Sequence, residues 1–241
     1  MNASNRKWNV AVIGLGSVAE SHLNAYAALD CVQLIGVADP RADRCGEIAE
    51  RYGVAGFARA EELFADCRPE IACILTPAVT HRSLTELCAA HHIHVLCEKP
   101  MAFDLPDATA MAEACRKAGV QFFYGSSYRF LPAIQEAKRL IREGALGDVR
   151  LILEHALGGR GPEAYRPLSA QHYPEGGPGG GGWGLVDHGI HMLDVFPWLC
   201  DSSIKSVLGR GDRSGAPARP EYALVQIASG ALGVLLYDDS S

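Results

Sequence analysis

Hydrophobic residues in the first half of the chain form short runs that alternate with segments of helical spacing. The runs are rich in β-branched residues and are typical of buried strands; they cover residues 10–13, 34–38, 71–75, 94–97 and 121–124. Between them, apolar residues recur every three or four positions, as in 42–52, 80–90 and 106–118. This alternation predicts an α/β fold, in which a doubly wound parallel sheet carries helices on both faces.

The pattern changes after Gly125. Residues 131–143 predict a helix, with Pro132 in its first turn and Gly144 just beyond its end. A helix over 186–199 follows the glycine-rich tract GGPGGGGWG, and strands are predicted at 148–157, 204–208, 222–228 and 231–237. We therefore predict two domains, residues 1–125 and residues 126–241, the second with an α+β fold and a mainly antiparallel open sheet.

The last predicted strand, at 231–237, is apolar and ends shortly before residue 241. An exposed apolar edge strand tends to pair with another chain unless something covers it. We expect this strand to form such an edge, covered either by a partner chain or by further chain beyond residue 241.

Composition narrows the function classes. Hydrophobic residues make up 48% of the chain and charged residues 21%, as in ordinary globular proteins. The net charge of -6 and the lack of a basic run argue against a nucleic-acid partner, and no apolar stretch approaches the ~20 residues that span a bilayer. The eight cysteines form no Cys-x-x-Cys pair and the N-terminus does not resemble a signal peptide, so we expect a cytoplasmic protein.

A glycine motif follows the first predicted strand. The segment GLGSVA at 14–19 fits the pattern G-x-G-x-x-G/A between a strand and a helix. Its first glycine permits a tight turn, its second lets the backbone approach a pyrophosphate, and the following helix directs its N-terminus at the phosphates. We predict a dinucleotide site, with cofactor contacts from Gly14, Leu15, Gly16, Ser17 and Val18.

The second predicted strand ends at Asp39, about twenty residues further on. A carboxylate at this position accepts hydrogen bonds from the adenosine ribose and repels a 2′-phosphate. We therefore expect NAD to be preferred over NADP. Arg41 and Arg44 could pair with a phosphate, which leaves NADP open as a second cofactor.

Glu98 and Lys99 follow the strand at 94–97, where the carboxyl ends of parallel strands border a ligand crevice. A lysine near a carbinol oxygen can donate a hydrogen bond and stabilise developing negative charge. Glu98 could bind a ribose hydroxyl or orient Lys99. The alternative is an exposed ion pair at the start of a loop.

The helix after the glycine tract carries a second group of polar residues. At about 100° per residue, Asp187, His191 and Asp194 share a narrow arc, whereas His188 points away from it. We expect Asp187 to orient His191 as a general base, the alternative being a surface Asp–His pair. A separate apolar stripe is predicted to face the core; it comprises Val186, Ile190, Leu193 and Pro197.

Three further histidines, His91, His92 and His94, lie close together in sequence. They fall in a helix-to-strand connection without a carboxylate or cysteine at ligand spacing. We therefore predict no metal site.

Taken together and in this order, the motifs resemble the glucose–fructose oxidoreductase and inositol dehydrogenase family (Gfo/Idh/MocA). The resemblance rests on GLGSVA, TPAVTH at 76–81, EKP at 98–100, SYRFLPAI at 127–134, GALGDV at 144–149 and DHGIHMLD at 187–194. It implies that Thr76, Pro77 and His81 line the cofactor and that Lys99, Asp187 and His191 form the catalytic group. It also implies a cis bond before Pro100, which would direct Lys99 into the cleft.

The resemblance further implies that subunits pair through the open sheet of the second domain as a homo-oligomer. Members of this family usually continue well past the point where this chain stops, so we expect a truncated chain.

The motifs and the resemblance lead to a predicted function. We expect an NAD(P)-dependent oxidoreductase that moves a hydride between a nicotinamide and a carbinol carbon of a sugar, inositol or related polyol, with Arg129 and Trp183 contacting the substrate. One alternative is an enzyme that uses bound NAD as a transient hydride acceptor in elimination, hydrolysis or epimerisation. The other is a non-catalytic dinucleotide sensor, against which the presence of all three predicted catalytic residues counts.

Overall fold

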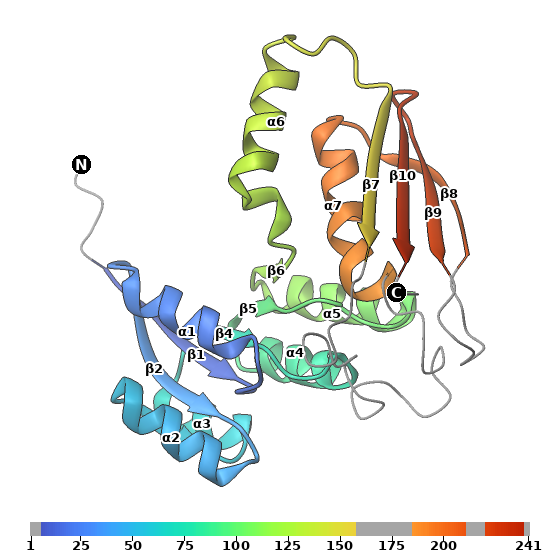
Figure 1. Cartoon of the computed structure of the whole chain (residues 1–241). Coiled ribbons are helices and arrows are strands. Elements are labelled where there is room, and N and C mark those ends of the chain that lie inside the picture. Colours follow the sequence, from blue (N-terminus) through green and yellow to red (C-terminus); the bar gives the residue numbers. More distant parts are fainter. Residues whose placement is uncertain (1–5, 158–184, 211–219, 239–241) are drawn as a thin grey trace. The chain divides into compact units, whose positions relative to one another are not determined.

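The computed structural model describes residues 6–157, 185–210 and 220–238. The chain divides into two compact units, Met1–Gly125 and Ser126–Ser241 (Figure 1). None of the described helices is long and apolar enough to cross a membrane.

The first unit contains a six-stranded parallel sheet in the order β3-β2-β1-β4-β5-β6. Its strands are β1 (Trp8–Ile13), β2 (Val32–Ala38), β3 (Ala55–Phe57), β4 (Ile71–Ile74), β5 (His94–Cys97) and β6 (Phe122–Tyr124). The order reverses between β1 and β4, so the carboxyl ends of these strands border a topological switch point, where such sheets bind ligands. The predicted doubly wound class is confirmed.

Helices cover both faces of this sheet, because successive side chains of a buried strand point to opposite sides. Val12 packs in a cluster with residues of α1 and α2, whereas Ile13 packs in a cluster with residues of α3, α4 and α5. The helices are α1 (Ala19–Ala28), α2 (Ala42–Tyr52), α3 (Ala60–Cys67), α4 (His81–Ala90), preceded by the 3₁₀ turn η1 (Ala78–Thr80), and α5 (Leu105–Ala118). Local signals set the ends of α5, since Asp104 accepts a hydrogen bond from the Asp107 amide and Gly119 follows the last turn.

The second unit contains a four-stranded sheet in the order β7-β10-β9-β8. Its strands are β7 (Leu151–Leu157), β8 (Ile204–Arg210), β9 (Glu221–Ile227) and β10 (Leu232–Asp238). Two pairings are antiparallel, but β10 runs parallel to β7, in a register that begins with Leu232 opposite Leu151. The prediction that the last strand forms an edge is therefore wrong: β7 pairs with it from a distant part of the chain.

One face of this sheet packs against α6 (Pro132–Arg142) and α7 (Ile190–Leu199), while the 3₁₀ turn η2 (Tyr128–Phe130) precedes α6. Val225 and Leu235 of the sheet are buried with Val195 and Phe196 of α7. A Cβ atom on Gly233 would lie 2.4 Å from the Phe196 ring, so this close approach requires glycine.

The predicted helix over 186–199 is divided. Its first turn, η4 (Leu185–Gly189), is π-helical, and α7 begins at Ile190. A π-turn changes the angle between successive residues, so the phase calculated at 100° does not hold across it. Within α7 the predicted core stripe is wrong, because Ile190, Leu193 and Pro197 are only partly buried, whereas the buried residues are His191, Met192, Val195, Phe196 and Leu199. The side chain of Val186, the fourth member of the stripe, lies outside the described residues. The segment is apolar on almost every side, and its sequence could not reveal the buried face.

Candidate active site

The glycine loop joins β1 to α1 and has the geometry that a pyrophosphate needs. Gly14 has φ +92°, and a Cβ there would lie 2.8 Å from both Thr76 and the Leu75 backbone. No atom lies within 4 Å of a Cβ built on Gly16, so the loop backbone is open on that side. The loop therefore fits a dinucleotide phosphate at the N-terminus of α1.

The other predicted loop residues differ in their surroundings. The Leu15 side chain is buried in the core, so only its backbone faces the loop, whereas Ser17 and Val18 are exposed. Their contacts with a cofactor stay predictions.

Asp39 follows β2 and is almost fully buried. Its Oδ2 accepts a 2.8 Å hydrogen bond from the Leu15 amide, while the Arg41 guanidinium binds both carboxylate oxygens at 2.9 Å. Burial alone would raise the pKa of Asp39, but hydrogen bonds from Arg41 and Leu15 hold it below its ordinary value. The carboxylate thus anchors the glycine loop, a role that sequence reasoning missed; its ribose contact stays a prediction.

His81, at the start of α4, connects the loops that follow β4 and β5. It is buried, with Nε2 2.8 Å from the Thr76 carbonyl oxygen and Nδ1 3.0 Å from the Pro100 carbonyl oxygen. Burial lowers the pKa of His81, against the effect of these carbonyls. The imidazole therefore connects the loop after β4 to the loop after β5. Cofactor contact by His81, Thr76 or Pro77 stays a prediction.

The segment after β5 holds Glu98 and Lys99 in a defined arrangement. The peptide bond between Lys99 and Pro100 is cis, as the resemblance implied. Glu98 Oε2 accepts a 2.8 Å hydrogen bond from the Lys99 amide, and Oε1 lies 3.0 Å from His22 Nε2. Sequence reasoning missed His22. The one feature of the sequence that points to it is its position in the first turn of the helix after the glycine motif.

In the second unit, His191 is buried against the ring of Tyr128. The two rings stack with centroids 4.0 Å apart and planes within 3°. The Tyr128 hydroxyl lies 3.2 Å from His188 Nδ1, and His188 Nε2 lies 3.3 Å from Glu154 Oε1 on β7. His188 and His191 therefore both contact Tyr128: His191 stacks on the face of its ring, whereas His188 meets the hydroxyl and also packs edge-on against the ring. The side chain of Asp187 lies outside the described residues, so its pairing with His191 stays a prediction.

Arg129, which was predicted to contact substrate, forms a bidentate ion pair with Asp194 of α7. Its Nε and Nη2 atoms each lie 2.5 Å from a carboxylate oxygen of Asp194, which ties η2 to α7. Its contact with substrate stays a prediction, and Trp183 lies outside the described residues.

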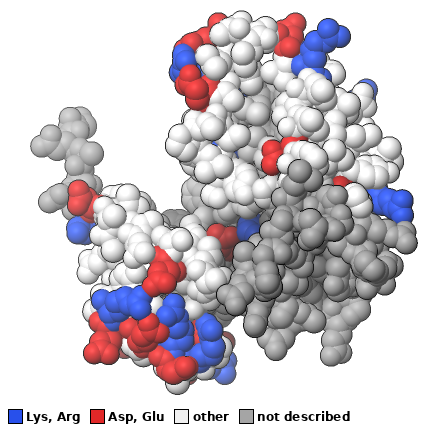
Figure 2. Space-filling model, in the orientation of Figure 1, with Lys and Arg blue, Asp and Glu red and all other residues white. Residues whose placement is uncertain are grey.

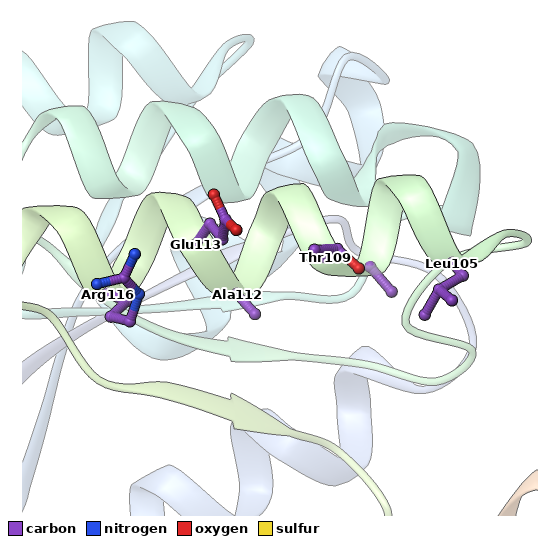
Figure 3. A pocket seen from close by; sticks show the side chains of 6 residues that line it. Leu105, Thr109, Ala112, Glu113 and Arg116 are labelled. Atoms are coloured by element: carbon purple, nitrogen blue, oxygen red, sulfur yellow. The ribbon is translucent and has the colours of Figure 1, made fainter.

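Other surface features do not extend the site. A hollow of about 330 Å³ runs along α5 (Figure 3), but all its lining residues come from that one helix, on the side away from buried Met111 and Cys115. Charges of both signs intermingle around α2 (Figure 2), where Arg51 pairs with Glu20 and Glu47. Within the described residues, no three potential metal ligands gather.

Comparison with known families assigns both units. Residues 8–126 match the model of the oxidoreductase family with an NAD-binding Rossmann fold, and residues 134–239 match the GFO/IDH/MocA C-terminal domain.

Individual relatives agree with these matches. The chain is 33% identical to D-apiose dehydrogenase of Paraburkholderia graminis, over 80% of this chain and 50% of the relative. It is 28% identical to myo-inositol 2-dehydrogenase of Thermotoga maritima, over 94% of this chain and 67% of the relative. A solved structure of a probable dehydrogenase from Thermotoga maritima superposes with a TM-score of 0.84 at 25% identity, covering 97% of this chain and 69% of that one.

The chain spans about half to two thirds of the length of these curated relatives. The two family models follow the order of the two units, with the first match ending one residue past Gly125, and that first model describes an NAD-binding domain. The chain belongs to the Gfo/Idh/MocA family of oxidoreductases.

Proposed function

We propose that the protein is an NAD-dependent dehydrogenase that acts on a secondary hydroxyl of a sugar, inositol or related polyol. Relatives named for D-apiose, D-glucoside and myo-inositol oxidation support this substrate class. The observation that carries the proposal is the geometry at the carboxyl ends of β1 and β5. There, an open glycine loop and the Glu98–Lys99 segment directly follow two strands of the same parallel sheet.

Each catalytic candidate has a proposed role. Bound NAD+ supplies the hydride acceptor for the carbinol carbon. Lys99 donates a hydrogen bond to the carbinol oxygen and stabilises the charge that develops there. His191 accepts the hydroxyl proton, and Asp187 orients its imidazole.

The test is NADH formation, followed at 340 nm, with NAD+ and a panel of aldoses, glucosides and inositols. We expect turnover with at least one member of the panel. NAD+ binding without NADH from any member would favour the transient-hydride or sensor alternatives, and failure to bind NAD+ would overturn the proposal.

We further propose that the chain forms a homo-oligomer through the sheet face opposite α7. On that face Leu151, Leu153, Leu208 and Leu232 are 60%, 59%, 64% and 38% exposed. Contiguous exposed apolar patches of this kind mark association surfaces. In light scattering, Leu151→Glu/Leu153→Glu should reduce the mass to that of a monomer, whereas Leu105→Glu on α5 should not. A wild-type monomer would contradict this proposal.

For the compartment, we propose the cytoplasm. All eight cysteines are free, and five of them are buried, as expected where thiols stay reduced. Fractionation of the native host would test this location, and recovery of the protein from an oxidising compartment would contradict it.

A further inference from the structure

His22 links the helix that follows the glycine loop to the end of β5. It lies in the first turn of α1, and its Nε2 is 3.0 Å from Glu98 Oε1. Its Nδ1 lies 3.6 Å from the Cys73 sulfur on β4 and 3.5 Å from the Tyr26 hydroxyl. One imidazole therefore contacts α1, β4 and the segment after β5.

Glu98 connects His22 to Lys99, because its carboxylate contacts both residues. One carboxylate oxygen faces His22, and the other accepts the hydrogen bond of the Lys99 amide at 2.8 Å. The side chains of His22 and Glu98 are only 20% and 14% exposed, so water screens their interaction weakly. Removing one partner of a buried pair leaves the other charge uncompensated.

The electrostatic surroundings keep both partners ionised. Hydrogen bonds to Cys73 and Glu98 raise the pKa of His22 to about 10. Burial alone would raise the pKa of Glu98, but hydrogen bonds from His22 and the Lys99 amide hold it below its ordinary value. The titratable or charged groups that face the pair are Tyr26 on α1, Cys73 on β4, Cys97 on β5, His81 on α4 and Lys99.

We propose that His22 is a positioning residue, which holds the Glu98 carboxylate and through it the backbone of Lys99 at the end of β5. A neutral replacement leaves Glu98 buried without its cationic partner, so the carboxyl takes up a proton at higher pH. Protonation of the Glu98 carboxylate then weakens the hydrogen bond that its Oε2 atom accepts from the Lys99 amide. The consequence for turnover rests on the proposed function, but the effect on Lys99 does not.

The experiment follows the Lys99 amide by ¹H–¹⁵N NMR in the full chain without cofactor, between about pH 5 and 8, a range that a buried carboxyl reaches when its pKa is raised. In the wild type, we expect the chemical shift of the Lys99 amide to show no change with pH that comes from ionisation of Glu98. In His22→Gln the amide should titrate within the range, and in His22→Gln/Glu98→Gln that titration should vanish. His91→Gln, at the opposite end of the sheet, is the matched control and should behave as the wild type.

A second arm does not depend on His22→Gln folding. The ¹⁵N signals of the His22 imidazole should remain those of the imidazolium up to pH 8 in the wild type, and in Glu98→Gln the pKa of His22 should fall. If the Lys99 amide behaves identically in His22→Gln and the wild type, or if Glu98→Gln leaves the His22 titration unchanged, the proposal is overturned. If the enzyme proves active, His22→Gln should also lower kcat roughly tenfold or more, the scale of misplaced catalytic groups. A lack of turnover in the wild type would reject the proposed function alone.

Discussion

The ring of Tyr128 lies flat against the imidazole of His191, with centroids 4.0 Å apart. Its hydroxyl reaches His188 at 3.2 Å. The stacked ring sets the plane of the His191 imidazole, the proposed base. The hydroxyl instead holds the imidazole of His188. The two functions of this tyrosine can therefore be separated by substitution.

Tyr128→Phe should lower kcat less than about threefold, because it loses the hydroxyl contact with His188 but keeps the ring contacts with His188 and His191. Tyr128→Ala removes the ring that stacks on His191. It should lower kcat at least about tenfold, the scale of a misoriented catalytic group. Steady-state kinetics with saturating NAD+ measures both. Equal losses in the two variants would show that the hydroxyl, not the stack, matters.

The two histidines should differ in the dependence of kcat on pH. His191→Ala should lose the basic assistance seen in the wild-type profile, and His188→Ala should retain it. Asp187→Asn should be intermediate, because it weakens the imidazole as a base. A larger loss for His188→Ala would move the catalytic role to the residue that contacts Tyr128 and Glu154.

Arg41 should determine how strongly the protein discriminates between the two cofactors. Its guanidinium neutralises the Asp39 carboxylate, and without it that carboxylate would repel a 2′-phosphate more strongly. We expect the wild type to bind NAD+ more tightly than NADP+, and Arg41→Ala to widen the ratio roughly fivefold to tenfold, about one charge pair at a part-exposed site. Fluorescence titration of both cofactors gives the ratio. Equal affinities or a wild-type preference for NADP+ would contradict this prediction and indicate that Arg41 or Arg44 binds the 2′-phosphate.

Lys138 stabilises the second unit from a buried position. Its Nζ lies 2.6 Å from the Trp198 carbonyl oxygen at the end of α7 and 2.7 Å from Asp201 Oδ1. Lys138→Met should lower the free energy of unfolding of this unit by about 1–3 kcal/mol, because the last carbonyls of α7 lose their cationic donor. Lys117→Met, on the exposed face of α5, should change it by less than ~0.5 kcal/mol. Urea denaturation compares the variants, and similar losses would argue against a special role for Lys138.

The first unit was largely predictable because its buried strands are short, continuous apolar runs between clear helices. Residues 94–97 were predicted with the bounds that β5 has in the structure. The edge strand β3, at Ala55–Phe57, was missed, because three residues around a glycine carry no measurable period. Strand pairing in the second unit was not predictable either, since β7 and β10 are far apart in sequence.

The candidate site was predictable only where a motif carries its own chemistry. The glycine loop and the Glu98–Lys99 segment have such motifs. The links that hold them, Leu15 to Asp39 and His22 to Glu98, join distant segments through single side chains. The π-turn at Leu185–Gly189 also escaped prediction, because hydrophobic periodicity does not distinguish it from an α-helix.

Lys99→Ala tests the central claim most directly, through NAD+ affinity and turnover measured on the same preparation. The account predicts near-normal NAD+ affinity and a fall in kcat of about 10²–10³-fold, the scale of one electrostatic or acid–base group. Lys117→Ala, an exposed lysine on α5, is the control. Near-normal turnover of Lys99→Ala on a substrate that the wild type oxidises would contradict the account and leave Lys99 as a surface charge.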